Sequence, residues 1–273
     1  FRAAPGPLCG QPGPCSKEAM SAGWPSAVLF SVLGLAVGSF LNVCIDRLPR
    51  GGSLLRPASH CDKCGYRLMP ADMVPLFSYI WLRGRCRICG AAIPRRVPVV
   101  EAITGLTFLF LWWHYGPTPR LPLSLLYSAL LLVIFFVDLE HRLVLGVVVY
   151  PAIVLALALS PLWPGLGLVR ALEGGALGAA LIFLPHLVYP KGMGLGDVQL
   201  AAFMGLVTGF PNVVVAFILA SLSGGLVAIF LLVARLRKRK DAIPFCPFLA
   251  TAIWVTMLWG RPLLDWYLGL FQR

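Results

Sequence analysis

Four cysteines in two closely spaced pairs are the first residues with an evident chemistry. Cys61 and Cys64 stand in CDKC, Cys86 and Cys89 stand in CRIC, and a glycine follows each pair. Two C-x-x-C pairs at this separation supply four thiolates in the tetrahedral arrangement that zinc prefers, and the glycine allows a tight turn. Because four thiolates leave no position for a substrate, we predict a structural zinc ion.

Redox or disulfide chemistry is the alternative interpretation of these four cysteines. Disulfides do not persist in a reducing compartment, and the charge pattern described below places the segment on the cytoplasmic side of a membrane. Zinc is therefore favoured. Cys44 and Cys246 lie at the ends of apolar stretches without partners in the sequence, and we interpret both as apolar packing.

Carboxylates in or against apolar stretches are the second candidate chemistry. They are Asp46, Glu101, Asp138, Glu173 and Asp197. Ionisable groups in such places are costly, which makes each a functional candidate. We interpret Glu101 as a structural polar contact near the cysteine segment and Glu173 as a structural residue near the outer membrane boundary.

Asp138 and Asp197 form the strongest pair, because both stand at predicted helix ends on one side of the membrane. Two carboxylates in a partly desolvated site cannot both ionise easily, so the pair can activate water and protonate a leaving amine. Gly192, Gly194 and Gly196 would leave room for a substrate backbone. The alternative is structural, with Asp138 at a membrane boundary and Asp197 as an N-cap.

Helix dipoles suggest which of the two carboxyl groups is charged. Asp197 would start a helix, where an anion is favoured, and Asp138 would end one, where it is disfavoured. Asp197 would then be the resting base and Asp138 the resting acid. His141 and Arg142, next to Asp138, favour the reverse order.

The elements that position these residues are membrane helices. The chain has 273 residues, of which 59% are hydrophobic and 12% charged, with a mean hydropathy of +0.83, well above the range of soluble domains. Uncharged stretches recur at 24–45, 102–119, 121–137, 143–169, 174–190, 198–234 and 242–260. The stretch 198–234 is too long for one crossing and must fold back near Gly209-Phe210-Pro211, leaving a short sixth helix at about 197–208.

The predicted fold is therefore an all-α polytopic membrane bundle of about eight transmembrane helices. Its predicted parts are a non-native or disordered extension (1–19), transmembrane helix 1 (20–47), a cytoplasmic four-cysteine zinc segment (48–96) and a transmembrane catalytic bundle (97–273). Gly34, Gly38 and Ser39 would permit close helix packing.

The distribution of charge predicts the orientation of the bundle. Most of the 23 basic residues fall in loops on the side of the zinc segment, and that side is cytoplasmic by the positive-inside rule. Membrane topology thus explains the net charge of +12 without nucleic-acid binding, and the same charge suits contact with anionic membrane lipid.

Several stretches resemble one protein family in the same order along the chain. GMGLGDVQL resembles the GxGD motif of type IV prepilin peptidases, and VDLEHRL resembles their first catalytic aspartate segment. GLAVGSFLNVCIDRLP, RGRCRICGAAIPRRVPVVEAITG and IPFCPFLA are similar to other blocks of the family. The resemblance runs from about residue 30 to 260. The chain departs from the family pattern at Val144-Leu145-Gly146, at Gln199 in place of a common lysine, and at Cys246 in place of a glycine.

The resemblance implies a membrane aspartic protease with Asp138 and Asp197 as catalytic residues. Its substrates would be type IV prepilins or pseudopilins, cut at the cytoplasmic face of the bacterial inner membrane. The resemblance also implies methylation of the new N-terminus with S-adenosylmethionine, although the sequence contains no Gly-rich cofactor fingerprint.

Two functions of other classes compete with this hypothesis. A carboxylate-based, ion-coupled transporter would place its acidic residues near the middle of the membrane with access from both sides, whereas both aspartates here lie at one boundary. A membrane thiol oxidoreductase would use the C-x-x-C pairs and would not hold stoichiometric zinc.

Overall fold

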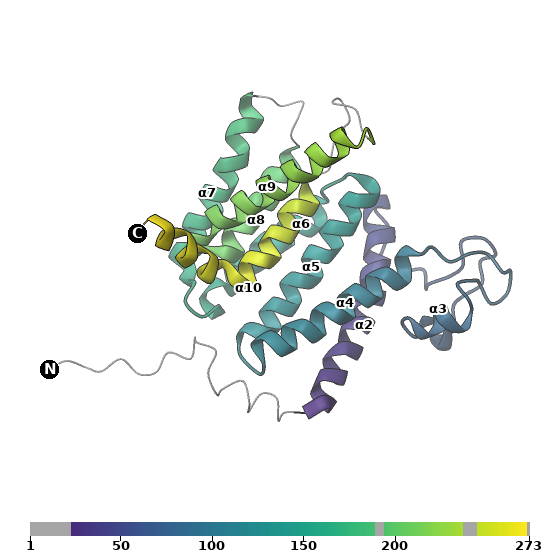
Figure 1. Ribbon diagram of the computed structural model, residues 1–273. Coiled ribbons are helices and arrows are strands. Elements are labelled where there is room, and N and C mark those ends of the chain that lie inside the picture. Colours follow the sequence, from purple (N-terminus) through teal and green to yellow (C-terminus); the bar gives the residue numbers. More distant parts are fainter. Residues whose placement is uncertain (1–22, 189–193, 237–244, 272–273) are drawn as a thin grey trace.

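The chain folds into a bundle of helices, shown in Figure 1. The computed structural model describes residues 23–188, 194–236 and 245–271, and apart from two isolated β-bridges the regular structure in these residues is helical. The elements are α2 (Gly23–Arg47), η1 (Leu48–Arg50), η2 (Pro70–Met73), α3 (Phe77–Trp81), α4 (Arg96–Tyr115), α5 (Arg120–His141), α6 (Gly146–Leu159), η3 (Ser160–Leu162), α7 (Gly167–Val188), α8 (Leu195–Thr208), α9 (Asn212–Val233) and α10 (Cys246–Phe271).

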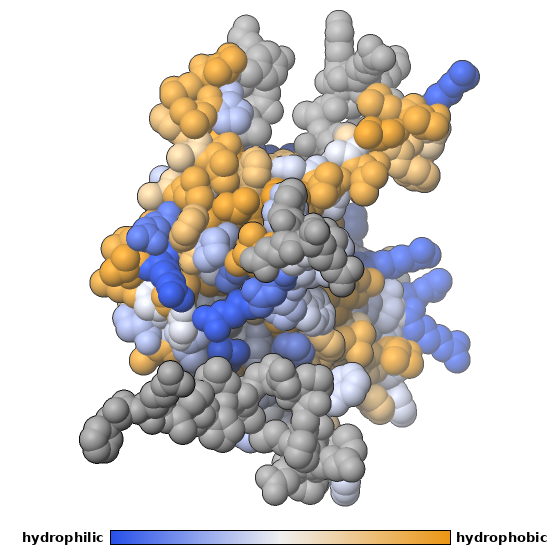
Figure 2. All heavy atoms as spheres, turned by 60° about the vertical axis from the view of Figure 1, so that its left-hand side comes forward, coloured by the Kyte–Doolittle hydropathy of each residue, from blue (hydrophilic) through white to orange (hydrophobic). Residues whose placement is uncertain are grey.

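The predicted all-α membrane bundle is confirmed. Among the described residues, 5 helices are long and apolar enough to cross a membrane, namely α2, α4, α5, α7 and α9, while α6 and α8 are shorter apolar helices. Large apolar side chains are exposed on the outside of the bundle. On α9, for example, they include Leu226, Ile229 and Phe230. Apolar residues accordingly occupy broad areas of the face in Figure 2, as expected for a surface that meets lipid.

The predicted break in the stretch 198–234 is confirmed. The backbone turns at Gly209, which has a φ of +68°, a conformation that favours glycine. The short sixth helix of the bundle is α8, with 14 residues.

The uncharged stretch 143–169 does not form one helix. The helix α6 ends at Leu159, and α7 already begins at Gly167. Pro161 and Pro164 cannot donate the hydrogen bonds that would extend α6, and Gly165 has a φ of +82°, so this connection reverses the chain.

Two pairs of helices pack unusually closely. A Cβ atom added to Gly34 or Gly38 of α2 would lie 2.8 Å from the α4 backbone at Gly105 or Glu101, which confirms the close packing predicted for these glycines. The pair α7 and α8 was not predicted. There a Cβ atom on Gly205 would collide with the backbone at Gly174, so glycine is needed where the two helices meet.

Helix ends from distant parts of the chain meet at one end of the bundle. Arg96, at the start of α4, forms ion pairs of 2.6 Å with Asp46 at the end of α2 and with Glu140 at the end of α5. The carboxylate of Asp46 is therefore used in an ion pair. At the same end, Gly196 in the first turn of α8 lies against Val144, which precedes α6.

Candidate active site and metal centre

Asp138 lies in the last turn of α5. The helix ends at His141, and the backbone N–H of Arg142, in a left-handed conformation, donates to the Asp138 carbonyl at 2.9 Å. The residue is 4% exposed, and its Oδ2 atom has no hydrogen-bond partner among the described residues. A buried carboxylate oxygen without a partner is costly and is a feature of functional sites.

Asp197 lies in the first turn of α8 and is only partly buried. Its backbone N–H donates to the Gly194 carbonyl at 3.1 Å. Its Oδ1 atom lies 2.9 Å from the Cys246 thiol of α10. Cys246 is 1% exposed, which agrees with its interpretation as a packing residue, but its contact with Asp197 was not predicted.

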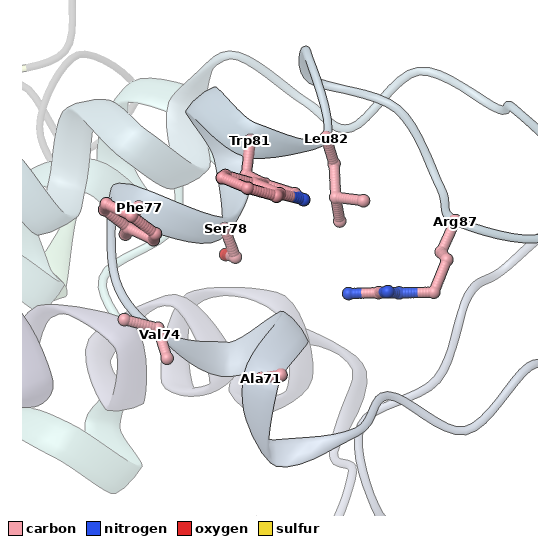
Figure 3. A pocket seen from close by; sticks show the side chains of 7 residues that line it. All are labelled: Ala71, Val74, Phe77, Ser78, Trp81, Leu82 and Arg87. Atoms are coloured by element: carbon pink, nitrogen blue, oxygen red, sulfur yellow. The ribbon is translucent and has the colours of Figure 1, made fainter.

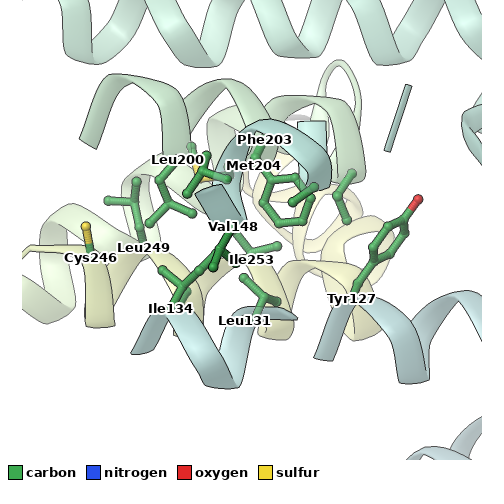
Figure 4. Close-up of a cluster of buried hydrophobic side chains, with 14 of the residues drawn as sticks. Tyr127, Leu131, Ile134, Val148, Leu200, Phe203, Met204, Cys246, Leu249 and Ile253 are labelled. Carbon is green, nitrogen blue, oxygen red and sulfur yellow. The ribbon is translucent and has the colours of Figure 1, made fainter. Parts of the chain in front are cut away.

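The structure brings Asp138, Asp197 and Cys246 into one site. The charges of the two carboxyl groups act on each other, and both act on the Cys246 thiol. The helix α10 packs against both α5 and α8. In the core shown in Figure 4, Leu249 of α10 lies near Leu200 of α8.

The two described glycines of the GxGD stretch differ in their surroundings. A Cβ atom on Gly196 would collide with Val144, so the absence of a side chain lets α8 approach the segment before α6. Gly194 is exposed, and a Cβ atom there would lie 3.8 Å from the Asp197 Oδ2 atom. Gly194 thus lies at the surface beside this carboxylate, whereas Gly196 serves helix packing. Gly192 lies outside the described residues.

One of the departures from the family pattern is accommodated by a direct contact. The Gln199 side-chain amide, one turn into α8, donates to the Tyr150 hydroxyl of α6 at 2.8 Å. This bond ties α8 to α6 near the carboxylates. Glu173 lies apart from the site, since it is exposed near the beginning of α7, at the opposite end of the bundle.

This arrangement can perform acid–base chemistry on a water molecule. One carboxylate is buried and the other opens toward the outside, and like charges at this range favour a state with one shared proton. The ionised group can take a proton from water while the protonated group donates one to a leaving group.

The four predicted zinc ligands come together in the segment between α2 and α4. Their Sγ atoms all lie within 4.8 Å of one another, with 3.8 Å between Cys61 and Cys89 and 4.0 Å between Cys64 and Cys86. A tetrahedron of Zn–S bonds of about 2.3 Å has edges of about 3.8 Å, so the thiols lie close to the arrangement that zinc needs.

The two C-x-x-C turns, which we call the knuckles (Cys61–Gly65 and Cys86–Gly90), have the same backbone geometry. In each, the glycine N–H donates to the carbonyl of the first cysteine, at 2.8 and 3.0 Å, and the glycine has a φ of +69° or +68°. Glycine is required at both positions, as predicted. Backbone N–H groups of Cys89 and Ile88 also lower the pKa of Cys86 to about 7, which favours the thiolate that a metal needs.

An unpredicted contact of the zinc segment is made by the carboxylate of Asp72. Asp72 accepts hydrogen bonds from the Arg87 guanidinium at 2.9 Å and from the Tyr66 hydroxyl at 3.2 Å. Burial alone would raise the pKa of Asp72, but the bonds from Arg87, Met69 N–H and Tyr66 outweigh it and hold that pKa below its usual range. Asp72 thus connects Arg87 of the second knuckle to Tyr66, which directly follows the first knuckle.

Glu101 ties the zinc segment to the bundle. It is 5% exposed on α4, and its carboxylate accepts the Leu76 backbone N–H at 2.8 Å. Leu76 precedes α3 and has a φ of +58°, a conformation that leucine rarely adopts. The interpretation of Glu101 as a structural contact near the cysteines agrees with this position.

The structure contains a cavity beside the knuckles and another in the bundle. The first, of about 250 Å³, is lined by Phe77 and Trp81 of α3, and Arg87 reaches toward it from the second knuckle (Figure 3). The other, of about 220 Å³, is lined mainly by apolar residues of α4, α5 and α10.

Comparison with known proteins assigns both halves of the chain. The family described as Bacterial Peptidase A24 N-terminal domain matches residues 32–115, and the Type IV leader peptidase family matches residues 125–229. A prepilin leader peptidase/N-methyltransferase of Pseudomonas aeruginosa is 34% identical, covering 87% of this chain and 91% of the relative. One from Myxococcus xanthus is 37% identical, covering 76% of this chain and 64% of the relative. No solved structure matches. The chain belongs to the type IV leader peptidase family.

Proposed function

We propose that this protein is a membrane aspartic endopeptidase that removes the leader of a type IV prepilin or pseudopilin. The observation that carries the proposal is the meeting of Asp138 and Asp197 at one end of the bundle, within range of each other's charge. The names of the relatives give the substrate class. The transporter alternative fits less well, because both carboxylates belong to helix ends rather than to helix centres.

In the proposed reaction, the two aspartates divide the proton transfers. The ionised Asp197 takes a proton from the water molecule as the water oxygen attacks the scissile carbonyl. Asp138 donates a proton to the leaving amine as the C–N bond breaks. Asp197 is the more open of the two carboxylates, which suits contact with water and substrate.

The apolar cavity between α4, α5 and α10 supports docking of an apolar substrate helix in the bundle. On α5 it includes Phe135 and Phe136, within one turn of Asp138, and on α10 it includes Ala250, about one turn from Cys246. An apolar helix of the substrate docked there would end beside the carboxylates. The leader junction would then lie at the membrane boundary.

The positions of basic residues support a cytoplasmic active site. Arg47, Arg50, Arg96, Arg142 and Arg235 all stand at the helix ends on the side of Asp138 and Asp197. By the positive-inside rule this end faces the cytoplasm of the bacterial inner membrane. The same residues would contact anionic lipid, and the proposal includes no nucleic-acid partner.

We propose methylation of the new N-terminus as the second activity, because the relatives are named as N-methyltransferases as well as peptidases. The cavity beside the knuckles offers two aromatic rings, Phe77 and Trp81 (Figure 3), against which the planar base of S-adenosylmethionine would stack. Zinc, bound by the four thiols, would hold this segment in shape.

The proposal is tested by incubating the purified protein with a prepilin in detergent, with and without S-adenosylmethionine. Mass spectrometry of the product reports leader removal and an added methyl group separately. We expect wild type to cleave, and Asp138→Asn and Asp197→Asn to lose about 1,000-fold or more in rate. Glu173→Gln is the matched control, since it changes an exposed carboxylate at the other end of the bundle. An intact prepilin after incubation with wild type would refute the proposal.

A further inference from the structure

Within the described part of the chain, the contact between Cys246 and Asp197 is the closest polar contact to either proposed catalytic carboxylate. The Cys246 Sγ atom lies 2.9 Å from the Asp197 Oδ1 atom, and the cysteine begins α10. Asp138 has no comparable partner, because its Oδ2 atom is buried without a hydrogen bond among the described residues. The two carboxylates are therefore held unequally.

Chemistry fixes the direction of this hydrogen bond. A thiolate buried beside two carboxyl groups would be strongly disfavoured, so the sulfur keeps its proton. A thiol then donates its S–H to the carboxylate, and an ionised carboxylate only accepts. Such a bond stabilises the charged form of the acceptor and restrains its orientation.

We propose that Cys246 is a positioning residue that holds Asp197 in its ionised form and in one orientation, and so leaves the proton of the pair on Asp138. The inference rests on the proposed function and adds to it the residue that fixes which aspartate is the base and which the acid. The start of α8 acts in the same direction, because the helix dipole favours an anion at Asp197.

Several other titratable groups among the described residues lie at the same end of the bundle as Asp197. They are Asp138, Glu140, His141 and Arg142 at the end of α5, Tyr150 on α6, His186 on α7, Arg235 after α9, and Cys246 on α10. Of these groups, the Cys246 thiol donates a hydrogen bond of 2.9 Å to the Asp197 carboxylate.

The pH dependence of prepilin cleavage tests the proposal. The acidic limb of kcat/KM reports ionisation of the base. In Cys246→Ala the donor is lost, and we expect the acidic limb to move to higher pH by about 0.5 to 1 unit. Cys246→Ser keeps a donor and should leave the limb near its wild-type position. Cys44→Ala is the matched control, because Cys44 is also buried but lies on α2.

Rescue by serine separates positioning from packing. Alanine and serine are both smaller than cysteine, so a packing defect would affect both variants alike. An acidic limb that stays in place in Cys246→Ala, or one that moves equally in Cys246→Ser, would overturn the proposal.

A measurement that needs no cleavage distinguishes failure of this inference from failure of the proposed function. The infrared S–H stretching band of Cys246 is isolated by subtracting the Cys246→Ala spectrum from that of wild type, and the Cys44 band is isolated in the same way. We expect the Cys246 band at lower wavenumber, because donation weakens the S–H bond, and we expect it to rise in Asp197→Ala. The inference would be overturned, even if prepilin is cleaved, by Cys246 and Cys44 bands at the same wavenumber. A Cys246 band that does not shift in Asp197→Ala would overturn it as well.

Discussion

The zinc segment and the carboxylate site are built in opposite ways. Each knuckle makes its own turn within five successive residues, and the two turns repeat the same glycine geometry. The carboxylates instead come from α5 and α8, and α10 packs against both helices. One site is specified by local sequence, the other by the packing of the bundle.

This difference predicts different vulnerabilities. The knuckles depend on their four thiols and on the contacts of Asp72, and should tolerate changes elsewhere in the bundle. The carboxylate pair depends on close approaches such as that of Gly196 to Val144. A change that leaves both aspartates in place can therefore still separate them.

Loss of a zinc ligand should have the largest effect on stability. In Cys61→Ser we expect loss of stoichiometric zinc and rapid proteolysis within residues 48–96, because binding of a structural zinc ion supplies folding free energy. The bundle should stay folded. Metal analysis and limited proteolysis check this, with Cys44→Ala as the control that keeps its zinc. Full zinc content in Cys61→Ser would show that the cluster is not a four-thiolate site.

Adding a single methyl group at the start of α8 should have the next largest effect on stability. Gly196→Ala places a Cβ atom against Val144, so we expect a loss of about 1–3 kcal/mol in the free energy of unfolding and a fall of about 10-fold or more in cleavage rate.

The matched control is Gly225→Ala in α9, where a Cβ atom would meet no described atom within 4 Å. It should unfold at or slightly above the wild-type temperature, because alanine favours a helix over glycine. Equal behaviour of the two variants would remove the packing argument for Gly196.

The smallest expected effect concerns Asp72. A carboxyl group whose pKa is lowered by folding stabilises the fold fully above its unfolded pKa of about 3.9, and this stabilisation is lost as the pH falls through the folded pKa. Asp72→Asn should therefore be less stable than wild type near neutral pH, and the difference should vanish in acid below both values. Protease susceptibility of the zinc segment at a series of pH values measures it. A difference that grows toward acid pH would reverse the sign of the argument.

Much of the zinc segment could be predicted from sequence, because spacing and turn chemistry are local properties. The four cysteines, their glycines and the chain reversal at Gly209 all belong to this class. Asp138 and Asp197 could be singled out for a different reason, since a carboxylate in an apolar stretch is conspicuous wherever the chain takes it.

The unpredicted features require knowledge of which helices touch. The role of Cys246 depends on the approach of α10 to α8, and an isolated cysteine in an apolar stretch carries no sign of its partner. The close approach of Gly174 and Gly205 depends in the same way on the pairing of α7 with α8. The role of Asp72 could not be predicted either, because its partners are far apart in the sequence: Arg87 belongs to the second knuckle and Tyr66 directly follows the first.

The central claim is that Asp138 and Asp197 act as one unit, and a double-variant comparison of prepilin cleavage tests it most directly. Rates of Asp138→Asn, Asp197→Asn and the double variant are measured by mass spectrometry over long incubations at high enzyme concentration. We expect all three to show the same low residual rate, because residues that act as a unit are not additive. A single variant that keeps a rate within a few-fold of wild type, or two losses that multiply in the double variant, would contradict the claim.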